Sequence, residues 1–327
     1  MNHKVLMIFT GGTIAMKVDP DKDAAVPAVG SSELMDMVKE VEKIATIETM
    51  DFSNIPSPHM TPTLMLELAN VVKENAKRDD LTGIVISHGT DTLEETAFFL
   101  DLNIQSDKPI ILVGAMRNNS ELGYDGAANI SAAIHTACSP QAKHKGVLAV
   151  MNNEIHAARD VTKTNAVAID TFKSPDTGPL GIVANQDVIF YRENIKDEHI
   201  DTEKIEEKVA LIKAVAGMES DLIEFYLDSG YKGIVIEALG SGNLPPSMVS
   251  GVKKAIDKKI PVILVSRCIK GPVVPAYGYE GGGKQLLDLG VILGGNQLGP
   301  KARIKLMLIL GVTNDLEDIK YFFNGAQ

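Results

Sequence analysis

The stretch VLMIFTGGTIAM, residues Val5 to Met16, decides how the rest of the chain is interpreted. Its apolar run from Val5 to Phe9 is typical of a strand buried on both faces, as in a parallel sheet. The run meets Thr10-Gly11-Gly12-Thr13, where two glycines permit a sharp turn that exposes backbone N–H groups. In an open α/β sheet, ligands bind beyond the carboxyl ends of the strands. The first strand is therefore predicted to deliver a hydroxyl-bearing turn to a ligand site.

The same turn has a plainer interpretation, since many Gly-rich turns only connect a strand to the next element. Loop residues at strand ends carry function more often than core residues do. From this turn alone, a functional role and a purely connecting role are equally well supported. A dinucleotide site is excluded, because GGTIAM lacks the third glycine and the G-x-G spacing of that fingerprint.

Composition limits the class of protein. The chain has 327 residues, 23% charged and 45% hydrophobic, which suits two globular domains or one large α/β domain. A formal net charge of -11 argues against a nucleic-acid-binding surface. Cys138 and Cys268 lie far apart and are expected to be buried thiols in a reducing compartment. The N-terminal apolar stretch is too short for a secretory signal and no run has the length of a membrane span, so a cytoplasmic protein is expected.

Strands and helices alternate along the first part of the chain, which predicts right-handed crossovers and a parallel sheet. After the first strand, further strands are expected at Ile44–Asp51, Leu81–Ser87, Pro109–Val113 and Gly146–Met151. Helices are expected from Ser31 and at Thr63–Lys77, Leu93–Leu102 and Asp125–Cys138. The polar segment Lys17–Gly30, with two prolines, is expected to be a loop whose composition fits a mobile lid.

A charged stretch without clear periodicity divides the chain. We expect a catalytic α/β domain over residues 1–190, a linker over 191–208 and a smaller α/β domain over 209–327. Strands of the smaller domain are expected at Val209–Ala214, Gly233–Ala238 and Pro261–Ser266. Its helices are expected at Asp221–Ser229, from Pro245 to about Lys258, at Gly299–Leu310 and near Asp315–Asn324, and Gly271–Gly283 is expected to be a Gly/Pro-rich loop.

A second polar turn follows the strand Leu81–Ser87, with the sequence His88-Gly89-Thr90-Asp91-Thr92. Thr92 with Glu95 three residues on is a capping-box pattern, so Thr90 and Asp91 are expected between a strand end and a helix start. They are either helix caps or functional groups. Lys163 belongs to the polar segment Arg159–Asn165, expected to be a loop or the edge of a β-hairpin, where a lysine is usually only solvated.

Several well-known functional motifs are incomplete or absent in this sequence. The stretch Gly278–Lys284 has P-loop spacing, but Gln285 stands where Mg²⁺ binding needs Ser or Thr. Ser87 and His88 are adjacent on a strand and point to opposite faces, so they form no nucleophile–base pair. No cluster with metal-ligand spacing occurs, and the lone histidines are expected to be structural: His59, His88 and His156.

The groups that remain are hydroxyl, carboxylate and amine groups at strand ends: Thr13, Ser57, Thr90, Asp91 and Lys163. A threonine hydroxyl needs a base to act as a nucleophile, and a desolvated lysine beside Thr and Asp can supply one. Backbone N–H groups at the Gly12, Thr90 and Ala115 turns are candidates for holding an oxyanion. This chemistry indicates acyl transfer, that is, amide or ester hydrolysis without a cofactor.

Five segments together resemble the bacterial L-asparaginase family, in order and separation across essentially the whole chain. They are TGGTIA, HGTDTLEETAFFLD, PIILVGAMR, RDVTKTN and GSGN. The resemblance implies an asparagine amidohydrolase with a larger flavodoxin-like N-terminal parallel-sheet domain and a smaller Rossmann-like C-terminal α/β domain. It also implies a homotetramer built from intimate dimers, or at least a homodimer, with active sites between subunits.

Roles follow motif by motif from this resemblance. Thr13 is similar to the family's nucleophile, and Thr90, Asp91 and Lys163 resemble its second triad, with Asp91 also binding the substrate ammonium. Ser57 resembles the residue that binds the substrate carboxylate, and the Ala115 backbone would meet the amide. Further contacts from a neighbouring subunit are implied for Asn243 and Glu280. The family's lid tyrosine has no counterpart in Lys17–Gly30, and Tyr279 of the partner subunit is our hypothesis for its replacement.

Three alternatives stay open at this point. A dual glutaminase–asparaginase would use the same residues, and Pro58-His59 stands where the family commonly has Gln-Asp beside the carboxylate binder. A non-catalytic amino-acid sensor would have no need of Thr13. The tRNA-dependent amidotransferase subunit of the superfamily fits less well, since an extra N-terminal domain is expected there and this chain starts at the first strand.

Overall fold

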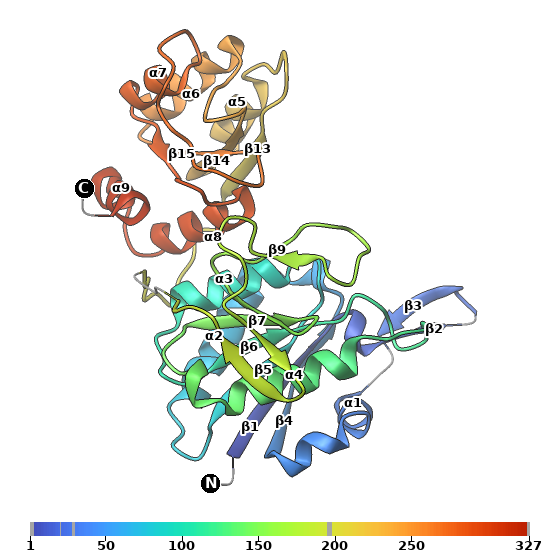
Figure 1. Ribbon diagram of the computed structural model, residues 1–327. Coiled ribbons are helices and arrows are strands. Elements are labelled where there is room, and N and C mark those ends of the chain that lie inside the picture. The colour runs from blue at the N-terminus through green and yellow to red at the C-terminus, as the bar shows by residue number, and fades with distance from the viewer. Residues whose placement is uncertain (1–2, 20, 28–29, 195–197, 326–327) are drawn as a thin grey trace. The chain divides into compact units, whose positions relative to one another are not determined.

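The computed structural model describes residues 3–19, 21–27, 30–194 and 198–325 (Figure 1). The chain divides into two compact units, Met1–His199 and Ile200–Gln327. The division falls inside the segment 191–208 that the sequence predicts as a linker, of which residues 195–197 lie outside the described part. Each unit has its own sheet and its own hydrophobic core.

Within the described residues, the first unit is built on an eight-stranded sheet. Its order is β12 (Asp187–Phe190), β11 (Gly181–Ala184), β8 (Glu154–Ala157), β7 (Val147–Met151), β6 (Ile110–Val113), β5 (Gly83–Ser87), β1 (His3–Gly11) and β4 (Ala45–Ile55). The last five of these are parallel, and they stand in the order 2-1-3-4-5 when numbered along the chain. That is the flavodoxin-like order, whose topological switch point lies between the first and third strands, here β1 and β5. The expected flavodoxin-like parallel-sheet domain is confirmed.

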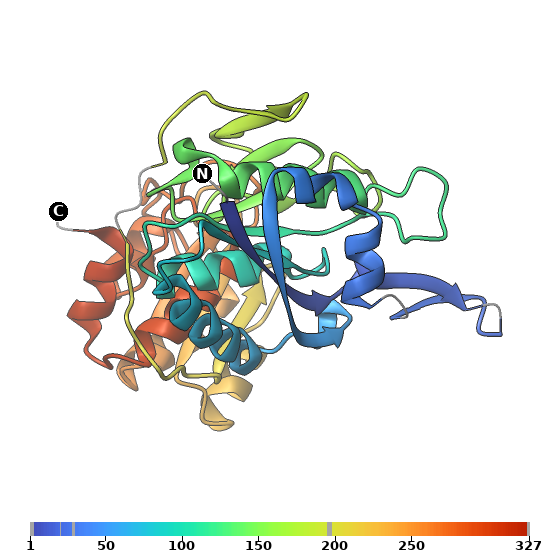
Figure 2. The same cartoon turned by 90° about the horizontal axis from the view of Figure 1, so that it is seen from below.

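Helices cover both faces of this sheet (Figure 2). Val5, Met7 and Phe9 on one face of β1 share a buried cluster with Ile130 and Ile134 of α4 (Gly126–Cys138). Alternate residues of β1 point to the opposite face, which α2 (Pro62–Ala76) and α3 (Leu93–Asn103) cover. Double coverage explains why the first strand is an unbroken apolar run.

The sheet continues past β7 in antiparallel strands, which the alternation of strands and helices did not predict. Asn152 and Asn153 both have positive φ, 47° and 61°, and this two-residue turn joins β7 to β8 as a hairpin. Further on, β9 (Thr162–Lys163) pairs with β10 (Phe172–Lys173) in a separate short hairpin. The expectation of a hairpin edge around Lys163 is confirmed.

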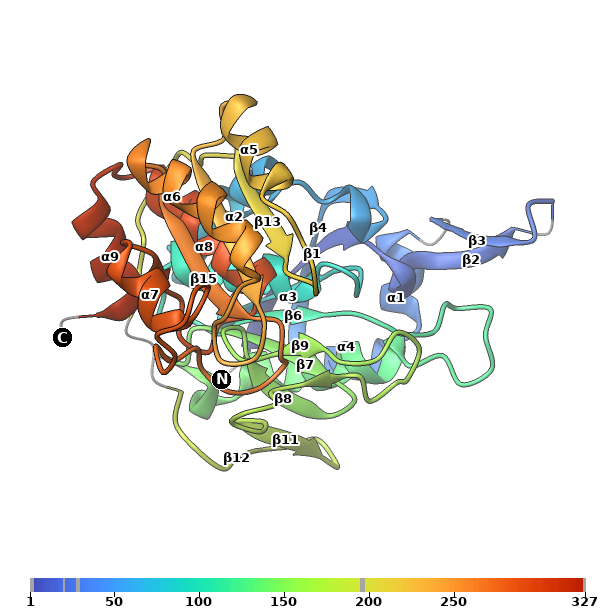
Figure 3. The same cartoon turned by 90° about the horizontal axis from the view of Figure 1, so that it is seen from above.

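The segment Lys17–Gly30 is not the loop that the sequence predicted. Over its described residues, β2 (Met16–Asp19) pairs antiparallel with β3 (Ala24–Pro27), and the hairpin projects from the sheet (Figure 3). The turn is stabilised by the Asp21 N–H, which donates to the Asp19 carboxylate at 2.9 Å. The helix predicted from Ser31 is also short, α1 (Ser31–Asp36), followed by the 3-10 segment η2 (Lys39–Lys43).

The second unit has a parallel four-stranded sheet among its described residues, in the order β13 (Val209–Lys213), β14 (Gly233–Ala238), β15 (Val262–Ser266) and β16 (Ile292–Leu293). Its helices are α5 (Asp221–Asp228), α6 (Val249–Asp257), α7 (Gly283–Asp288), α8 (Gly299–Leu310) and α9 (Leu316–Asn324). The smaller α/β domain is thus confirmed, while α7 and β16 were not predicted. In the described part of the chain, no helix has the length and apolarity that crossing a membrane requires.

Candidate active site

Two polar turns meet at the switch point of the first sheet. β1 and β5 are parallel neighbours with Phe9 opposite Ser87, so the loops that follow them leave the same edge. These loops touch through glycine backbones, because a Cβ atom added to Gly12 would lie 2.3 Å from the Cα of Gly89. Thr13 and Thr90 each follow directly in sequence. The fold therefore brings together the two threonines that the sequence placed at separate strand ends.

Thr13 opens the one-turn 3-10 segment η1 (Thr13–Ala15). Gly12 before it has φ 86°, a conformation that favours glycine. The Gly12 N–H donates to the Ile55 carbonyl at 3.0 Å. This N–H was one of the three predicted donors to an oxyanion, and in the structure it is already used. Thr90 and Ala115 then remain as the proposed backbone donors.

Ser57 belongs to the 3-10 turn η3 (Ser57–His59) and packs directly against the second loop. Its Oγ accepts the Asp91 N–H at 3.2 Å, and its carbonyl accepts the Thr92 hydroxyl at 2.9 Å. Only 5% of Ser57 is exposed, and a Cβ atom on Gly89 would meet its side chain at 2.6 Å. Ser57 thus lies beside Thr90 and Asp91, as the predicted site requires.

The capping box predicted at Thr92 and Glu95 is wrong in one respect. Thr92 is the N-cap of α3, but its side chain makes no capping hydrogen bond. The hydroxyl donates to Ser57 instead, so tertiary contact between two loops replaces the local cap.

Lys163 reaches the second loop from β9, more than 70 positions away in sequence. Its Nζ lies 3.0 Å from Thr90 Oγ1 and 2.7 Å from Asp91 Oδ1. The Lys163 side chain is 16% exposed and that of Asp91 59%, so the ion pair lies at the border between protein and solvent. The Thr90 hydroxyl accepts from Lys163 and keeps its own proton for another acceptor.

The backbone of Lys163 is fixed as well as its side chain. Its N–H donates to Glu94 Oε2 at 2.7 Å, and Glu94 lies in the first turn of α3, where a negative charge suits the helix dipole. Sequence reasoning did not single out Glu94. An acidic residue in a first helical turn is a visible signal, but its partner on a distant hairpin is not.

His88 is buried behind this loop and has a structural role, as expected. Its Nδ1 faces the Gly89 carbonyl at 2.8 Å and must donate, so Nε2 accepts from the Thr96 hydroxyl at 2.9 Å. Complete burial lowers the pKa of His88 to about 4, against a smaller opposing effect of the Gly89 carbonyl. The neutral imidazole fits both partners.

The loop after β6 carries Ala115 and is held by a carboxylate that the sequence did not single out. Asp125, the N-cap residue of α4, accepts the N–H groups of Met116 at 3.1 Å and Arg117 at 2.9 Å. Asn129 Nδ2 donates to Asp125 and, at 3.0 Å, to the Gly114 carbonyl. Asp125 thus binds the loop that precedes α4 and makes no side-chain capping hydrogen bond to its own helix, a role that the spacing of a helix cap does not indicate.

Asn243 and Glu280 belong to the second unit, where two loops join. The Gly283 N–H donates to Asn243 Oδ1 at 3.3 Å, and the Leu244 N–H donates to the Gly281 carbonyl at 2.8 Å. Glu280 is exposed beside these contacts. The structure thus brings together the two loops that carry Asn243 and Glu280, and their role toward a substrate stays a prediction.

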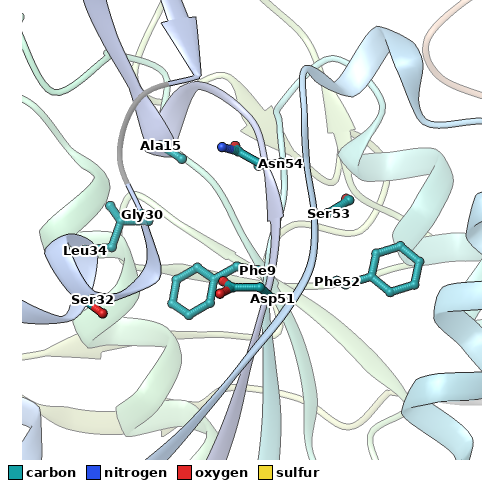
Figure 4. Close-up of a pocket in the computed structure, with 10 residues that line it drawn as sticks. Phe9, Ala15, Gly30, Ser32, Leu34, Asp51, Phe52, Ser53 and Asn54 are labelled. Atoms are coloured by element: carbon teal, nitrogen blue, oxygen red, sulfur yellow. The ribbon is translucent and has the colours of Figure 1, made fainter.

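A cavity of ≈ 440 Å³ lies beside the Thr13 turn (Figure 4). Gly11 and Ala15, which flank that turn, contribute to its wall, together with Phe9, Asp51 and Asn54. Thr13, Thr90, Asp91 and Lys163 are not among the residues that line it. The cavity is therefore distinct from the predicted catalytic groups.

Comparison with known proteins covers both units. Residues 4–196 match the model of the asparaginase N-terminal domain, and residues 208–323 match that of the glutaminase/asparaginase C-terminal domain. L-asparaginase 2 of Bacillus subtilis is 36% identical over 98% of this chain and 86% of its own length. A subunit of the glutamyl-tRNA(Gln) amidotransferase of Pyrococcus furiosus is 36% identical over 97% of this chain and 74% of its own length.

A solved structure agrees with these matches. It is described as a probable cytoplasmic L-asparaginase from Campylobacter jejuni, and it superposes with a TM-score of 0.87 at 33% identity, over 98% of this chain and 99% of that one. With both domain models matched in order and relatives similar along their length, the chain belongs to the asparaginase family of amidohydrolases.

Proposed function

We propose that this amidohydrolase is an L-asparaginase, which converts L-asparagine and water to L-aspartate and ammonia. The observation that supports this most directly is the Lys163 Nζ, within hydrogen-bond distance of Thr90 and Asp91, beside the loop that presents Thr13. Relatives named L-asparaginase from two Bacillus species support the same substrate.

In the proposed first step, Thr13 Oγ attacks the carbonyl carbon of the substrate side-chain amide. The Thr13 proton passes to the proposed relay of Thr90 and Lys163, and the oxyanion that forms is held by backbone N–H groups of the Thr90 and Ala115 loops. Collapse of this intermediate breaks the C–N bond, the amide nitrogen leaves as ammonia with the transferred proton, and an aspartyl ester of Thr13 remains.

In the second step, a water molecule attacks the ester carbon and gives its proton to the departing Thr13 oxygen, which releases L-aspartate. We assign activation of the water to Thr90 together with Lys163, whose Nζ lies 3.0 Å from Thr90 Oγ1. The Thr90 oxygen takes a proton from the water as it passes its own proton to the Lys163 amine, and the proton returns along the same path to the departing Thr13 oxygen. Asp91 holds Lys163 in place, and its exposed carboxylate binds the substrate ammonium. Ser57 binds the substrate α-carboxylate beside it.

Glutamine is the alternative substrate. Pro58 and His59 are exposed at the turn that carries Ser57, where the family resemblance implies a different pair. One extra methylene in a pocket is worth only ~1–3 kcal/mol in discrimination, so the same residues would support dual activity. The third candidate, an amino-acid sensor, would bind without turnover.

Ammonia release from L-asparagine and from L-glutamine, with wild type beside Thr13→Ala, tests the proposal. We expect asparagine turnover that falls by ~10³-fold or more in the variant, as for loss of a nucleophile. A folded wild type that releases no ammonia from either amide contradicts the proposal. Comparable rates on both amides would establish the dual enzyme.

We also propose a homotetramer or homodimer in which a neighbouring subunit contributes Asn243 and Glu280 to each site. Mixing Thr13→Ala with Asn243→Ala subunits tests this, because a mixed interface would contain one intact site. Return of activity on mixing supports a shared site, and no return in confirmed hybrids contradicts it. Cytoplasmic location is proposed too, in line with free Cys138 and Cys268 and the name of the Campylobacter structure.

A further inference from the structure

The loop between β6 and α4, residues 114–125, runs beside the segment that follows Thr13 (Figure 3). Three hydrogen bonds join them: Tyr124 Oη to the Ile14 carbonyl at 2.9 Å, Asn119 N–H to the Met16 carbonyl at 3.1 Å, and Val18 N–H to Ser120 Oγ at 3.0 Å. The contacts fall on alternate residues of the Thr13 segment. The Ala115 loop therefore supports the turn of the proposed nucleophile along one side.

Of these contacts, the Tyr124 hydrogen bond lies closest to Thr13. Successive carbonyls of the turn have different partners: that of Gly12 accepts the Ala15 N–H at 2.9 Å, and that of Thr13 accepts the Met16 N–H. The next carbonyl, on Ile14, accepts the Tyr124 hydroxyl. Ile14 is fully buried, so the tyrosine supplies a donor where solvent has little access.

Tyr124 is itself held in place. A Cβ atom on Gly126 would lie 2.2 Å from the Tyr124 hydroxyl, so the ring rests directly over this glycine. The neighbouring Asp125 is fixed by the N–H groups that it accepts. Burial, with a smaller effect of the Asp125 charge, raises the pKa of Tyr124, so the hydroxyl stays protonated and able to donate at neutral pH.

We propose that Tyr124 is a positioning residue for catalysis: its hydroxyl fixes the Ile14 peptide and thereby aims Thr13 at the substrate. This rests on the proposed function, in which Thr13 is the nucleophile. Tyr124 acts through the backbone and not on Thr13 Oγ. Because a short turn has few hydrogen bonds of its own, one lost donor allows the peptide to rotate and the hydroxyl to move.

The first experiment is Tyr124→Phe, which keeps the ring and removes only the hydroxyl. We expect kcat on L-asparagine to fall ~10- to 100-fold, the range for a small misplacement of a reacting group, with KM within about twofold. Rates are normalised to the number of sites that bind L-aspartate, measured by calorimetry, so that a smaller fraction of folded protein does not lower the apparent kcat. Tyr191→Phe is the control, since Tyr191 is in the same unit and 61% exposed.

A second variant reaches the same contact by another route. Gly126→Ala pushes the tyrosine off its glycine while leaving its hydroxyl intact. If both changes act through the hydrogen bond to Ile14, the double variant has a kcat close to that of the slower single variant. If the fold-decrease in kcat of the double variant equals the product of the two single decreases, the two changes act separately, which would contradict the proposal.

A third experiment separates hydrogen-bond donation by the Tyr124 hydroxyl from packing of the Tyr124 ring. Replacing Tyr124 with a difluorotyrosine, which ionises at lower pH than tyrosine, keeps the shape of the side chain. We expect kcat to fall as pH rises through that ionisation only in the fluorinated enzyme, because a phenolate cannot donate to the Ile14 carbonyl. A pH profile equal to that of wild type, or a Tyr124→Phe kcat within twofold of wild type, overturns the proposal. Inactive wild type would instead overturn the proposed function.

Discussion

Gly12 and Gly89 lie in backbone contact, so closely that a Cβ atom on Gly12 would sit 2.3 Å from both the N and the Cα of Gly89. The contact joins the loop of the proposed nucleophile to the loop of the proposed relay. Neither loop has a side chain at the point of contact. The distance between Thr13 and Thr90 is thus set by main chain, which adjusts less readily than side chains.

Gly89→Ala is expected to damage both stability and activity. Its Cβ atom would lie 2.6 Å from the Ser57 side chain and 3.0 Å from Gly12 Cα, and such overpacking costs ~1–3 kcal/mol. Urea unfolding measures the loss, and turnover should fall by ~100-fold because the two loops separate. At Gly30, where nothing lies within 4 Å of an added Cβ atom, the same substitution is the control. Equal turnover in the two variants would contradict the role assigned to the contact.

Lys163→Met is expected to abolish most activity with little change in stability. Its partner Asp91 is 59% exposed, so the ion pair contributes little to folding, whereas loss of a catalytic base costs ~10²- to 10⁴-fold in kcat. Lys163→Arg should not restore the rate, because a guanidinium does not give up its proton.

Lys173→Met is the matched control for Lys163. Lys173 lies on the partner strand β10 and forms its own ion pair with Glu154 at 3.1 Å. Removing this charge from the same hairpin should leave kcat within about twofold of wild type. If Lys173→Met lowers turnover as much as Lys163→Met does, the loss of activity comes from disturbance of the β9–β10 hairpin and not from removal of the Lys163 amine.

His88 should make the protein sensitive to acid. Its pKa in the fold is about 4, against 6.5 when unperturbed, so between these values the unfolded chain binds a proton that the folded chain does not. The free energy of unfolding therefore falls as pH falls from 6.5 to 4, by up to ~3 kcal/mol at 1.36 kcal/mol per pH unit. Urea titrations across this range measure the slope.

The His88→Gln variant separates that slope from overall stability. It removes the titrating group, so its unfolding free energy should vary less with pH even though it is lower at pH 7. Part of the slope will remain, because burial also lowers the pKa of His156 to about 4. An unchanged slope would show that His88 is protonated within the fold.

The two thiols are expected to react very differently. Cys138 is 8% exposed, and burial raises its pKa to about 11. Cys268 is exposed, so the prediction that both thiols are buried is wrong for this residue. Because the thiolate is the reactive form, a maleimide at neutral pH should label native protein once, at Cys268, and twice only in denaturant. Cys268→Ser protein should stay unlabelled when native, and rapid labelling of it would contradict the burial of Cys138.

The sequence predicted the parallel core of the first unit because four of its five described strands, β1, β5, β6 and β7, are buried on both faces, as for Val5 to Phe9. It did not predict the antiparallel strands at the sheet edge. The strands β8, β11 and β12 are each only four residues long, and Ile189 of β12 is 42% exposed, so no long apolar run marks them in the sequence. The β2–β3 hairpin was missed for a different reason, since the polar composition of Lys17–Gly30 and its two prolines indicated a loop.

Site residues at strand ends could be predicted because topology alone places them at one edge. The supporting contacts could not be predicted. Glu94 and Lys163 are distant in sequence, and Asp125 lies eight positions beyond Arg117, a separation that no regular turn or capping pattern indicates. Thr92 shows the limit most clearly. Local spacing predicted a helix cap, while the folded chain uses that hydroxyl for Ser57.

Under the proposed function, the turn Ser57–His59 offers a way to change substrate selectivity without changing the chemistry. Its first residue is immobilised by the relay loop, but Pro58 and His59 face solvent and carry no catalytic group. We therefore expect mutations of Pro58 and His59 to alter which substrate side chains are admitted, while the proposed nucleophile Thr13, Lys163 and the contact between Gly12 and Gly89 stay unchanged. Substitutions at these two positions would then be enough to change substrate preference, which makes Pro58 and His59 the positions at which directed evolution should begin.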